Sequence, residues 1–178
     1  MPDKYLFASE RLGFRNWIDS DVSKMIDISS DPDVMKFFPA IATKIQTVEF
    51  IDRMKLMCVE KGYCYFVVDQ LKDGSFIGFI GLCYQTYESQ FTRSVDIRWR
   101  LNKKYWNNGF ATEGAKKYLD YGFNKLGLNK IIATTPIINI KSIRLMEKIG
   151  MAKLTESKHP RVQSDNKISD CVCFGIFN

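Results

Sequence analysis

Residues 95–113 read VDIRWRLNKKYWNNGFATE, and this stretch joins a strand pattern to a helix through a short polar turn. The first seven residues alternate strictly, so one face of the predicted strand carries Val95, Ile97, Trp99 and Leu101 and the other carries Asp96, Arg98 and Arg100. After the turn, Gly109 begins a helix that is predicted to reach about Leu126. Its small first residues and unpaired N–H groups favour a phosphate or pyrophosphate. It is neither a Walker loop nor a GxGxxG pattern.

Strand and helix patterns continue on both sides of this stretch. Six further strands are predicted, at Glu10–Trp17, Tyr63–Asp69, Phe76–Gln85, Ile131–Thr135, Met151–Glu156 and Asp170–Phe177. Three further helices are predicted to start at Asp19 or Ser20, at the capping box Thr43–Gln46, and at Asn139. This order predicts an α/β (α+β) protein with a mixed sheet. No linker or repeat divides residues 1–178, so we expect a single domain.

The positive charge is concentrated in one part of the chain. Residues 103–148 hold nine basic and three acidic residues, whereas the rest of the chain holds 17 of each, so this segment carries the whole net charge of +6. Such a concentration favours an anionic partner. The basic residues are spread singly through two helices, with no run or arm of Arg and Lys. A compact phosphorylated ligand therefore suits them at least as well as nucleic acid, and we do not expect nucleic acid as the partner. A solvated basic face without a ligand is the remaining interpretation.

The cysteines give no sign of a metal site. The chain has one histidine and no CxxC pair, so we expect no metal. The five cysteines, expected to pack as reduced small hydrophobes, are Cys58, Cys64, Cys83, Cys171 and Cys173. Neither a secretory signal nor an apolar stretch long enough for a membrane span is present, and a cytoplasmic protein with no membrane contact is the expectation.

Two segments resemble a known superfamily. WNNGFATEGAKKYLDYGF (residues 106–123) and NKIIATTPIINIKSIRLMEKIGM (residues 129–151) resemble the GNAT superfamily of acyl-CoA-dependent N-acetyltransferases. They are most similar to the RimJ/RimL branch of ribosomal-protein N-terminal acetyltransferases, as are SDPDVMKFFP and FIGFIGL. The resemblance covers nearly the whole chain. It implies a mixed, mostly antiparallel twisted sheet of about seven strands, splayed between the fourth and fifth strands and flanked by about four helices.

The resemblance also implies where acetyl-CoA, the co-substrate, would bind. Backbone groups of Trp99, Arg100 and Leu101 would pair with the pantetheine arm, and Asn139 would hydrogen-bond the cofactor near its thioester. The pyrophosphate would be held by the N–H groups of Asn107, Asn108, Gly109, Phe110, Ala111 and Thr112. Lys104, Lys141 and Arg144 are candidate phosphate contacts, and Glu113 is expected to support the helix start.

Two positions depart from the family pattern. Asn107 replaces a glycine that is common after the tryptophan, although Asn tolerates positive φ better than most residues. Met146 stands where many members carry a tyrosine that protonates the departing thiolate, and Met has no proton to give. In the RimJ/RimL branch a serine at the position of Ser142 is the usual candidate acid. Ser142 is alternatively a first-turn serine that assists the helix cap.

The implied reaction is attack of a neutral amine on the acetyl thioester through a tetrahedral intermediate. An α-amino group is roughly 10–15% neutral at pH 7, whereas a lysine is only about 0.04% neutral and needs a real base. The candidate bases are Asp96, Glu88 and His159, with a water chain sufficient for an α-amine. Asp96 is equally suited to an ion pair with Arg98 or Arg100.

The sequence leaves several classes of acceptor open. A protein N-terminal α-amine leads, followed by a small amine such as a polyamine, an antibiotic or an amino-acid derivative. A non-catalytic acyl-CoA sensor and a nucleic-acid binder are the other classes. The two early helices usually shape the acceptor site in this superfamily, and the protein is expected to be a monomer or homodimer. Four aromatic residues are candidates to line an acceptor groove, with core packing as the alternative: Trp17, Phe37, Phe38 and Tyr87.

Overall fold

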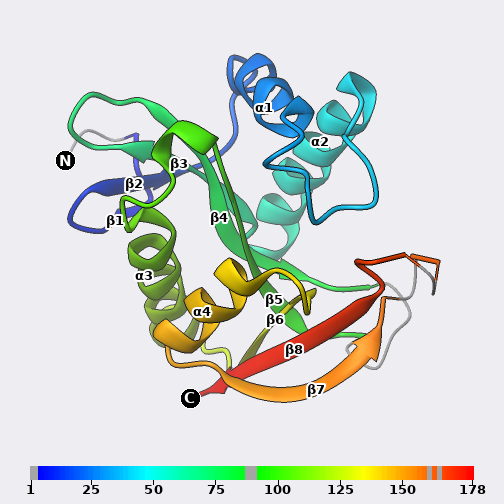
Figure 1. Cartoon of the computed structure of the whole chain (residues 1–178). Helices are drawn as coiled ribbons and strands as arrows, with labels where there is room; N and C mark the ends of the chain where they lie inside the picture. Colours follow the sequence, from blue (N-terminus) through cyan, green and yellow to red (C-terminus); the bar gives the residue numbers. More distant parts are fainter. Residues whose placement is uncertain (1–3, 87–91, 160–161, 164–165) are drawn as a thin grey trace.

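The computed structural model describes residues 4–86, 92–159, 162–163 and 166–178, and these residues form a twisted sheet covered by helices (Figure 1). The described strands are β1 (Phe7–Ala8), β2 (Leu12–Arg15), β3 (Tyr65–Gln70), β4 (Phe76–Tyr84), β5 (Val95–Leu101), β6 (Lys130–Pro136), β7 (Ala152–Lys158) and β8 (Asp170–Phe177). The described helices are α1 (Asp21–Ser30), α2 (Lys44–Lys61), the short 3-10 helix η1 (Lys103–Tyr105), α3 (Phe110–Asn124) and α4 (Ile140–Lys148).

The strand order is β1-β2-β3-β4-β5-β6-β8-β7, and every neighbouring pair is antiparallel except β5 and β6. The predicted mixed, mostly antiparallel sheet is confirmed, but the count of about seven strands was one short of the eight in the described residues. The additional strand is β1, whose two residues pair with Gly13 and Phe14 of β2. Two residues are too few to show the period-two alternation by which the other strands were predicted.

The sheet opens between β5 and β6. Strand β5 pairs with β4 along its whole length, from Gly78↔Leu101 to Tyr84↔Val95, but it pairs with β6 only at Asp96↔Ile132. The five residues of β5 that follow Asp96 therefore run on beside an open edge. This is the splay expected between the fourth and fifth predicted strands, which correspond to β5 and β6.

Helices cover both faces of the sheet, so β4 is apolar on both sides (Figure 1). On one face Phe79 packs against Phe50 of α2 and Tyr65 of β3, with ring centroids 5.2 and 5.3 Å away. On the other face Ile80 contacts α3 so closely that a Cβ at Gly114 would lie 2.4 Å from its Cδ1 atom. Residues of β5 thus point alternately towards α1 and α2 or towards α3.

A buried ion network joins β2, α1 and β3. The guanidinium of Arg15 forms two hydrogen bonds with Asp21, at 2.6 and 2.8 Å, and two with Asp69, at 2.7 and 3.0 Å. Both carboxylates are fully buried, and Lys4 forms an ion pair with Asp69 at 2.7 Å. Burial raises the pKa of Asp69, but the hydrogen bonds from Arg15 and Lys4 outweigh it, so the pKa lies below its ordinary value.

Two local predictions are also confirmed. Thr43 and Gln46 form the capping box of α2, and Gly62 ends that helix in a left-handed conformation. Four of the five cysteines are buried, as expected for small hydrophobes, and Cys58 is only partly buried.

Within the described residues no helix is long and apolar enough to cross a membrane, and no three metal-ligating side chains gather.

Candidate active site

The open edge of β5 leads directly into the turn before α3. Trp99 and Arg100 are half-buried and Leu101 is buried. On the side of β5 that faces β6, the two strands have diverged at these residues, and β6 does not pair with them. The Leu101 carbonyl accepts a hydrogen bond from the Trp106 indole N–H at 2.9 Å. This bond fixes the end of the strand against the turn. An extended ligand can therefore lie along β5 as an added strand.

The turn itself has the conformation that an anion site needs. Asn107 and Gly109 both adopt left-handed backbone angles, with φ of 60° and 80°, so the asparagine that replaces the usual glycine still takes the expected conformation. Asn107, Asn108 and Gly109 are exposed, and a Cβ at Gly109 would meet only the Arg11 guanidinium, 3.4 Å away. The N–H groups at the start of α3 have no partner within the helix. The space and the donors fit a pyrophosphate.

The start of α3 is anchored by Glu113 in a way that the sequence did not reveal. Its carboxylate accepts hydrogen bonds from the Ser9 hydroxyl at 2.6 Å, the Arg11 backbone N–H at 2.8 Å and the Arg11 Nε at 2.6 Å. Arg11 also donates to the Asn108 carbonyl at 3.1 Å and lies 4.5 Å above the Phe110 ring. Glu113 was predicted to support the helix start through the helix dipole alone. Arg11 and Ser9 were missed because they lie about a hundred residues away in sequence.

Asn139 and Ser142 meet at the first turn of α4. The Asn139 side chain accepts a hydrogen bond from the Ser142 N–H at 3.4 Å and donates to the Ser142 hydroxyl and to the Thr135 hydroxyl, both at 3.0 Å. Ser142 thus assists the helix cap, and its oxygen serves as an acceptor, which leaves its own proton to be donated. Met146, one turn later, is buried with 2% of its surface exposed.

Of the basic residues predicted to contact phosphate, Lys141 lies beside the turn. Its ammonium group is 5.6 Å from the centre of the Trp106 ring, so the start of α4 approaches the turn before α3. Lys104 lies over its neighbour Tyr105, with 4.8 Å between ammonium and ring centre, and Arg144 is exposed on α4. Lys103 forms an ion pair with Asp33 instead.

Asp96 points towards the face covered by α1 and α2, where its carboxylate already has two partners. It accepts a hydrogen bond from the Tyr65 hydroxyl at 2.5 Å and forms an ion pair with Arg98, whose Nε is 2.7 Å away. Gln85 donates to the same tyrosine hydroxyl at 3.2 Å, and Asp96 is 2% exposed. Of the two arginines that the alternation offered, the structure pairs Asp96 with Arg98. Both of its oxygens therefore already accept hydrogen bonds within the protein.

Arg100 points to the same face and is enclosed by aromatic rings. Its guanidinium lies 4.3 Å from the Phe38 ring and 5.5 Å from the Phe79 ring, and it donates to the Ser29 hydroxyl at 3.2 Å. Its Nε is buried and has no hydrogen-bond partner within the described part of the chain. Burial lowers the pKa of Arg100 to about 10, so it remains a cation at neutral pH.

The remaining candidates are dispersed. Trp17 is a core residue: 4% exposed, it donates its indole N–H to the Tyr65 carbonyl at 2.7 Å. Phe38 faces the site under Arg100, whereas Phe37 is half-buried beside Lys36. His159 follows β7, and its backbone N–H bonds the Ser169 carbonyl at 2.7 Å. Tyr87 and Glu88 lie outside the described residues.

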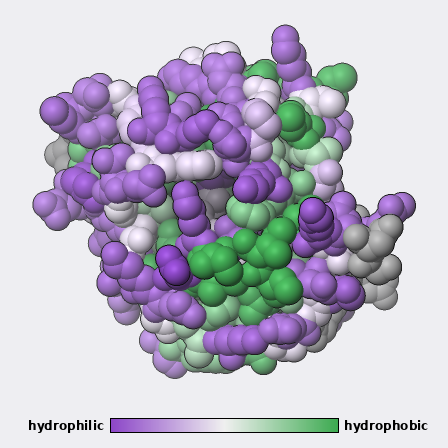
Figure 2. Space-filling model, in the orientation of Figure 1, coloured by the Kyte–Doolittle hydropathy of each residue, from purple (hydrophilic) through white to green (hydrophobic). Residues whose placement is uncertain are grey.

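An exposed apolar surface lies beside Asn139. Ile137 and Ile138, in the connection between β6 and α4, and Ile140, the first residue of α4, are 37%, 47% and 51% exposed. Figure 2 shows an apolar patch, coloured green, in the middle of this face of the molecule, over the same connection in Figure 1. Exposed apolar surface of this kind is typical of a site that contacts a partner or ligand.

A strand edge that opens next to the N-terminus of a helix suits a class of proteins that bind an extended ligand with phosphates at one end. The comparison with known proteins gives the particular family. The model of the acetyltransferase (GNAT) domain matches residues 11–152, and the chain belongs to this family. It is therefore an N-acetyltransferase, and acetyl-CoA is its acetyl donor.

Relatives span nearly the same length as this chain. The uncharacterised protein YkkB of Bacillus subtilis is 32% identical over 154 residues, which cover 85% of this chain and 87% of the relative. The uncharacterised N-acetyltransferase YnaD of the same organism is 34% identical over 147 residues, 82% of each chain. The crystal structure of a GNAT-family acetyltransferase from Bacillus anthracis is 30% identical and has a TM-score of 0.79, covering 96% of both chains.

Two more distant structures share the fold and differ in their named substrates. A spermidine N-acetyltransferase from Vibrio cholerae, in complex with CoA and spermine, has a TM-score of 0.75 at 19% identity and covers 94% of this chain and 95% of its own. A ribosomal-protein-S5-alanine acetyltransferase from Vibrio fischeri has the same TM-score and identity, with 97% and 96% covered. At this identity the likeness shows the fold alone.

Proposed function

We propose that this N-acetyltransferase acetylates the α-amino group of a protein N-terminus, as enzymes of the RimJ/RimL type do. The observation that carries the proposal is the state of Asp96, the acid that β5 presents on the face towards α1 and α2. Tyr65 and Arg98 each bind one oxygen of its carboxylate, so both oxygens are occupied by partners within the protein rather than directed to an acceptor amine. An α-amine, with a pKa of about 7.7–8.0, is partly neutral at pH 7 and needs the least help.

In the proposed complex, acetyl-CoA lies along the open edge of β5. Backbone groups of Trp99, Arg100 and Leu101 pair with the pantetheine arm, and residues 107–112 donate N–H groups to the pyrophosphate. Asn139 hydrogen-bonds the arm near the thioester, while Arg11 and Lys141 add positive charge around the turn. A thioester held at this edge meets the acceptor amine at the point where the strands diverge, which supplies much of the rate through positioning.

The chemical step is direct attack of the neutral amine on the thioester carbonyl. A backbone N–H of β5 stabilises the oxyanion of the tetrahedral intermediate. When the carbon–sulfur bond breaks, the Ser142 hydroxyl gives its proton to the leaving thiolate and is itself held in place by Asn139. The ammonium formed on the acceptor loses its proton to solvent, either directly or through a water chain past Asp96, and the Ser142 oxygen takes a proton back from solvent, which restores its hydroxyl.

A polyamine is the main alternative acceptor, because one structure of the same fold is a spermidine acetyltransferase. Two features of this chain oppose it. The face of β5 towards α1 and α2 carries Arg98 and Arg100 against the one carboxylate of Asp96, so this face of the strand is net positive and repels a polycation. The exposed isoleucines beside Asn139 suit the side chains of a peptide better than a strongly hydrated polyamine.

Matched acceptors test the proposal. One peptide has a free N-terminus and no lysine, a second has a blocked N-terminus and one lysine, and spermidine is the third acceptor. We expect turnover with the first, at least tenfold faster than with the other two, and a kcat/KM that rises with pH to a plateau above about pH 8. Faster turnover of spermidine or of the blocked peptide would replace the proposed acceptor.

A further inference from the structure

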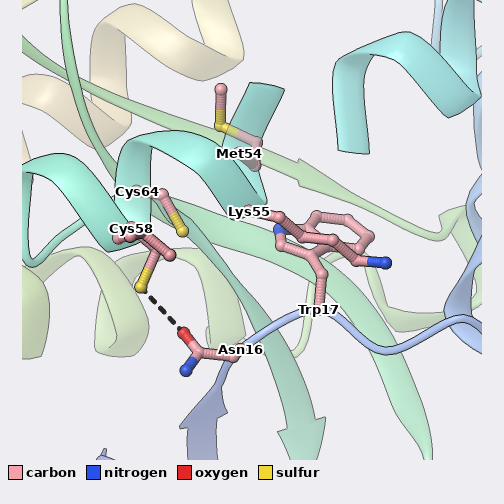
Figure 3. Close-up of a pocket in the computed structure, with 7 residues that line it drawn as sticks. Asn16, Trp17, Met54, Lys55, Cys58 and Cys64 are labelled. Atoms are coloured by element: carbon pink, nitrogen blue, oxygen red, sulfur yellow. Dashed lines mark hydrogen bonds between the residues drawn. The ribbon is translucent and has the colours of Figure 1, made fainter. Parts of the chain in front are cut away.

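A cavity lies away from the proposed acetyl-CoA site and shares no residue with it. It has a volume of about 210 Å³ and lies between the C-terminal half of α2, the segment after β2 and the chain entering β3 (Figure 3). Its lining residues are Asn16, Trp17, Met54, Lys55, Cys58, Val59 and Cys64. The cavity is thus bordered by two thiols, neither of which the acetyl transfer uses.

The end of α2 brings these two thiols together. Gly62 adopts a left-handed conformation at the end of the helix, and the chain reverses so that Cys64, just before β3, lies against Cys58 in the last turns of α2. Cys64 is fully buried, whereas Cys58 is partly exposed at the cavity and contacts the Asn16 side-chain oxygen, 3.0 Å from its sulfur. Figure 3 shows both sulfurs between the helix and Asn16.

The Cys58 thiol donates a hydrogen bond to the Asn16 side-chain oxygen, whereas Cys64 favours the Cys58 thiolate. Hydrogen bonding from Cys64 lowers the pKa of Cys58 to about 7, although partial burial acts in the opposite direction, and burial raises the pKa of Cys64. Lys55 on the cavity wall is a cation bonded to Asp19 at 2.7 Å. The phenols of Tyr118 and Tyr121 on α3 stay neutral, because burial raises the pKa of both. Cys58 therefore combines access with a neighbouring proton donor.

We propose that Cys58 is a site of oxidation by hydrogen peroxide and that Cys64 resolves the product to a Cys58–Cys64 disulfide. The Cys58 thiolate attacks one peroxide oxygen, the O–O bond breaks, and the hydroxide released takes a proton to become water, leaving Cys58 as a sulfenic acid. The Cys64 sulfur then attacks the Cys58 sulfur. The S–O bond breaks, and the Cys64 proton leaves with the hydroxide as a second water.

The electrons balance in this sequence, since two thiols supply the two electrons that reduce one peroxide.

The first step makes the second step easier. Burial is the main reason that Cys64 resists ionisation, but the negative charge of the Cys58 thiolate adds to it, and this contribution disappears once Cys58 is a neutral sulfenic acid. The three other cysteines lie outside the cavity and are buried in the sheet.

Mass spectrometry of the peroxide-treated protein tests the proposal. We expect a loss of 2 Da on oxidation, from the two hydrogens removed, reversible by dithiothreitol. Alkylation after denaturation then labels two thiols fewer than in the reduced protein. Trypsin cuts after Lys61, so the disulfide joins the peptides at residues 56–61 and 62–72. Absence of this linked peptide, or a disulfide that maps to other cysteines, would refute the proposal.

Three variants separate the two roles. Cys58→Ser should form no disulfide, and Cys64→Ala should stop at a sulfenic acid that dimedone traps on Cys58. Cys83→Ala, which removes a buried thiol of β4 away from the cavity, should still form the Cys58–Cys64 disulfide and serves as the matched control. If Cys58→Ser loses thiols to peroxide as fast as the wild type, Cys58 is not the site of oxidation.

A second measurement needs only the wild type and so does not depend on whether a variant folds. The rate of Cys58 alkylation by iodoacetamide in the folded protein is followed against pH by peptide mapping. We expect a midpoint near pH 7, against about 8.5 for free cysteine, which gives roughly 16-fold more thiolate at pH 7. A midpoint at or above 8.5 would remove the basis of the proposal.

Discussion

The hydroxyl of Ser142 accepts a hydrogen bond from the Asn139 amide, which in turn donates to Thr135. This arrangement orients the serine oxygen while leaving its proton available. The position where many family members carry a tyrosine is filled by Met146, whose side chain packs in the core. At the scale of single residues, we therefore propose that Ser142 gives the proton to the leaving thiolate.

Substitution of Ser142 by alanine should slow the chemical step while leaving binding unchanged. We expect Ser142→Ala to lower kcat by roughly 100-fold, with the Kd of acetyl-CoA within about twofold of the wild type, because only proton donation in the transition state is lost. Steady-state kinetics and calorimetry measure the two quantities. Ser23→Ala, an exposed change on α1, is the control. An unchanged kcat would exclude Ser142 as the acid.

At the scale of elements, the start of α3 depends on backbone shape and on one distant clamp. Gly109 has a φ of 80°, which alanine adopts only with strain, and Glu113 ties the helix start to Ser9 and Arg11 of the N-terminal segment. The backbone that we propose as the pyrophosphate site is thus fixed before the ligand arrives. Such preorganisation lowers the entropic cost of binding.

Two glycine variants separate strain from binding. Gly109→Ala should cost about 1–2 kcal/mol of stability and weaken acetyl-CoA binding at least tenfold, because relief of the strain moves the N–H donors. Gly74→Ala, at a φ of 71° in the β3–β4 hairpin with open space around it, should cost a similar amount of stability but leave binding unchanged. Thermal unfolding measures the stability of both variants, and calorimetry measures their affinity for acetyl-CoA. Equal affinities in the two variants would contradict the assigned role of Gly109.

The buried network of Arg15, Asp21 and Asp69 holds β2, α1 and β3 together. The pKa of Asp69 is lower in the folded protein than in the unfolded chain, where a carboxylate titrates near 3.9. A carboxylate of this kind stabilises the fold fully at pH values well above 3.9. Its contribution is lost as the pH falls through 3.9 towards the lower folded value.

Removal of this carboxylate should therefore matter most near neutral pH. Asp69→Asn is expected to lower the free energy of unfolding by about 3–5 kcal/mol at pH 7, since it leaves Arg15 buried with one partner fewer. The deficit should narrow between pH 5 and pH 3, as the wild type loses the same contribution. Urea unfolding at several pH values measures this. Asp27→Asn, on the exposed side of α1, is the control, and a pH-independent deficit would show that ionisation is not its origin.

At the scale of the whole molecule, the charge is unevenly placed. The net charge of +6 belongs to residues 103–148, which include the turn before α3 and the first turn of α4. Some of these charges are used internally, as in the Lys103–Asp33 and Lys117–Asp120 ion pairs. Arg11 lies outside the basic segment but reaches the same turn. The resulting positive field suits the phosphates of acetyl-CoA.

Salt should weaken acetyl-CoA binding through this field. Between 50 and 500 mM NaCl we expect the Kd of acetyl-CoA to rise roughly 3- to 10-fold, because the Debye length falls well below 10 Å. Acetyl-pantetheine, which has the same thioester and no phosphate, should bind with little dependence on salt. A generic DNA duplex is the control for a polyanion without the thioester arm. Binding of the duplex as tight as that of acetyl-CoA would favour the nucleic-acid interpretation.

Much of the fold was accessible from local sequence. The strict alternation of residues 95–101, the capping box at Thr43 and the glycines that end helices each act over a few residues, so the elements they predict agree with the structure. Strand β1 was missed because its two residues are too few to show the alternation of apolar and polar side chains that marks a strand. The splay followed from the family resemblance and is confirmed by the single β5–β6 pair at Asp96.

The sequence by itself thus determined every strand and α-helix except β1, the order of these elements, and the turn that we propose as the phosphate site, because hydrophobic period, caps and turn residues are local properties. Only the tertiary structure decided which charged and polar groups become partners. It paired Asp96 with Arg98, placed Trp17 in the core, joined Glu113 to Arg11 and set Cys58 against Cys64. These contacts depend on how twisted strands and helices pack, and that packing is fixed by the burial of the whole chain rather than by any one stretch of it.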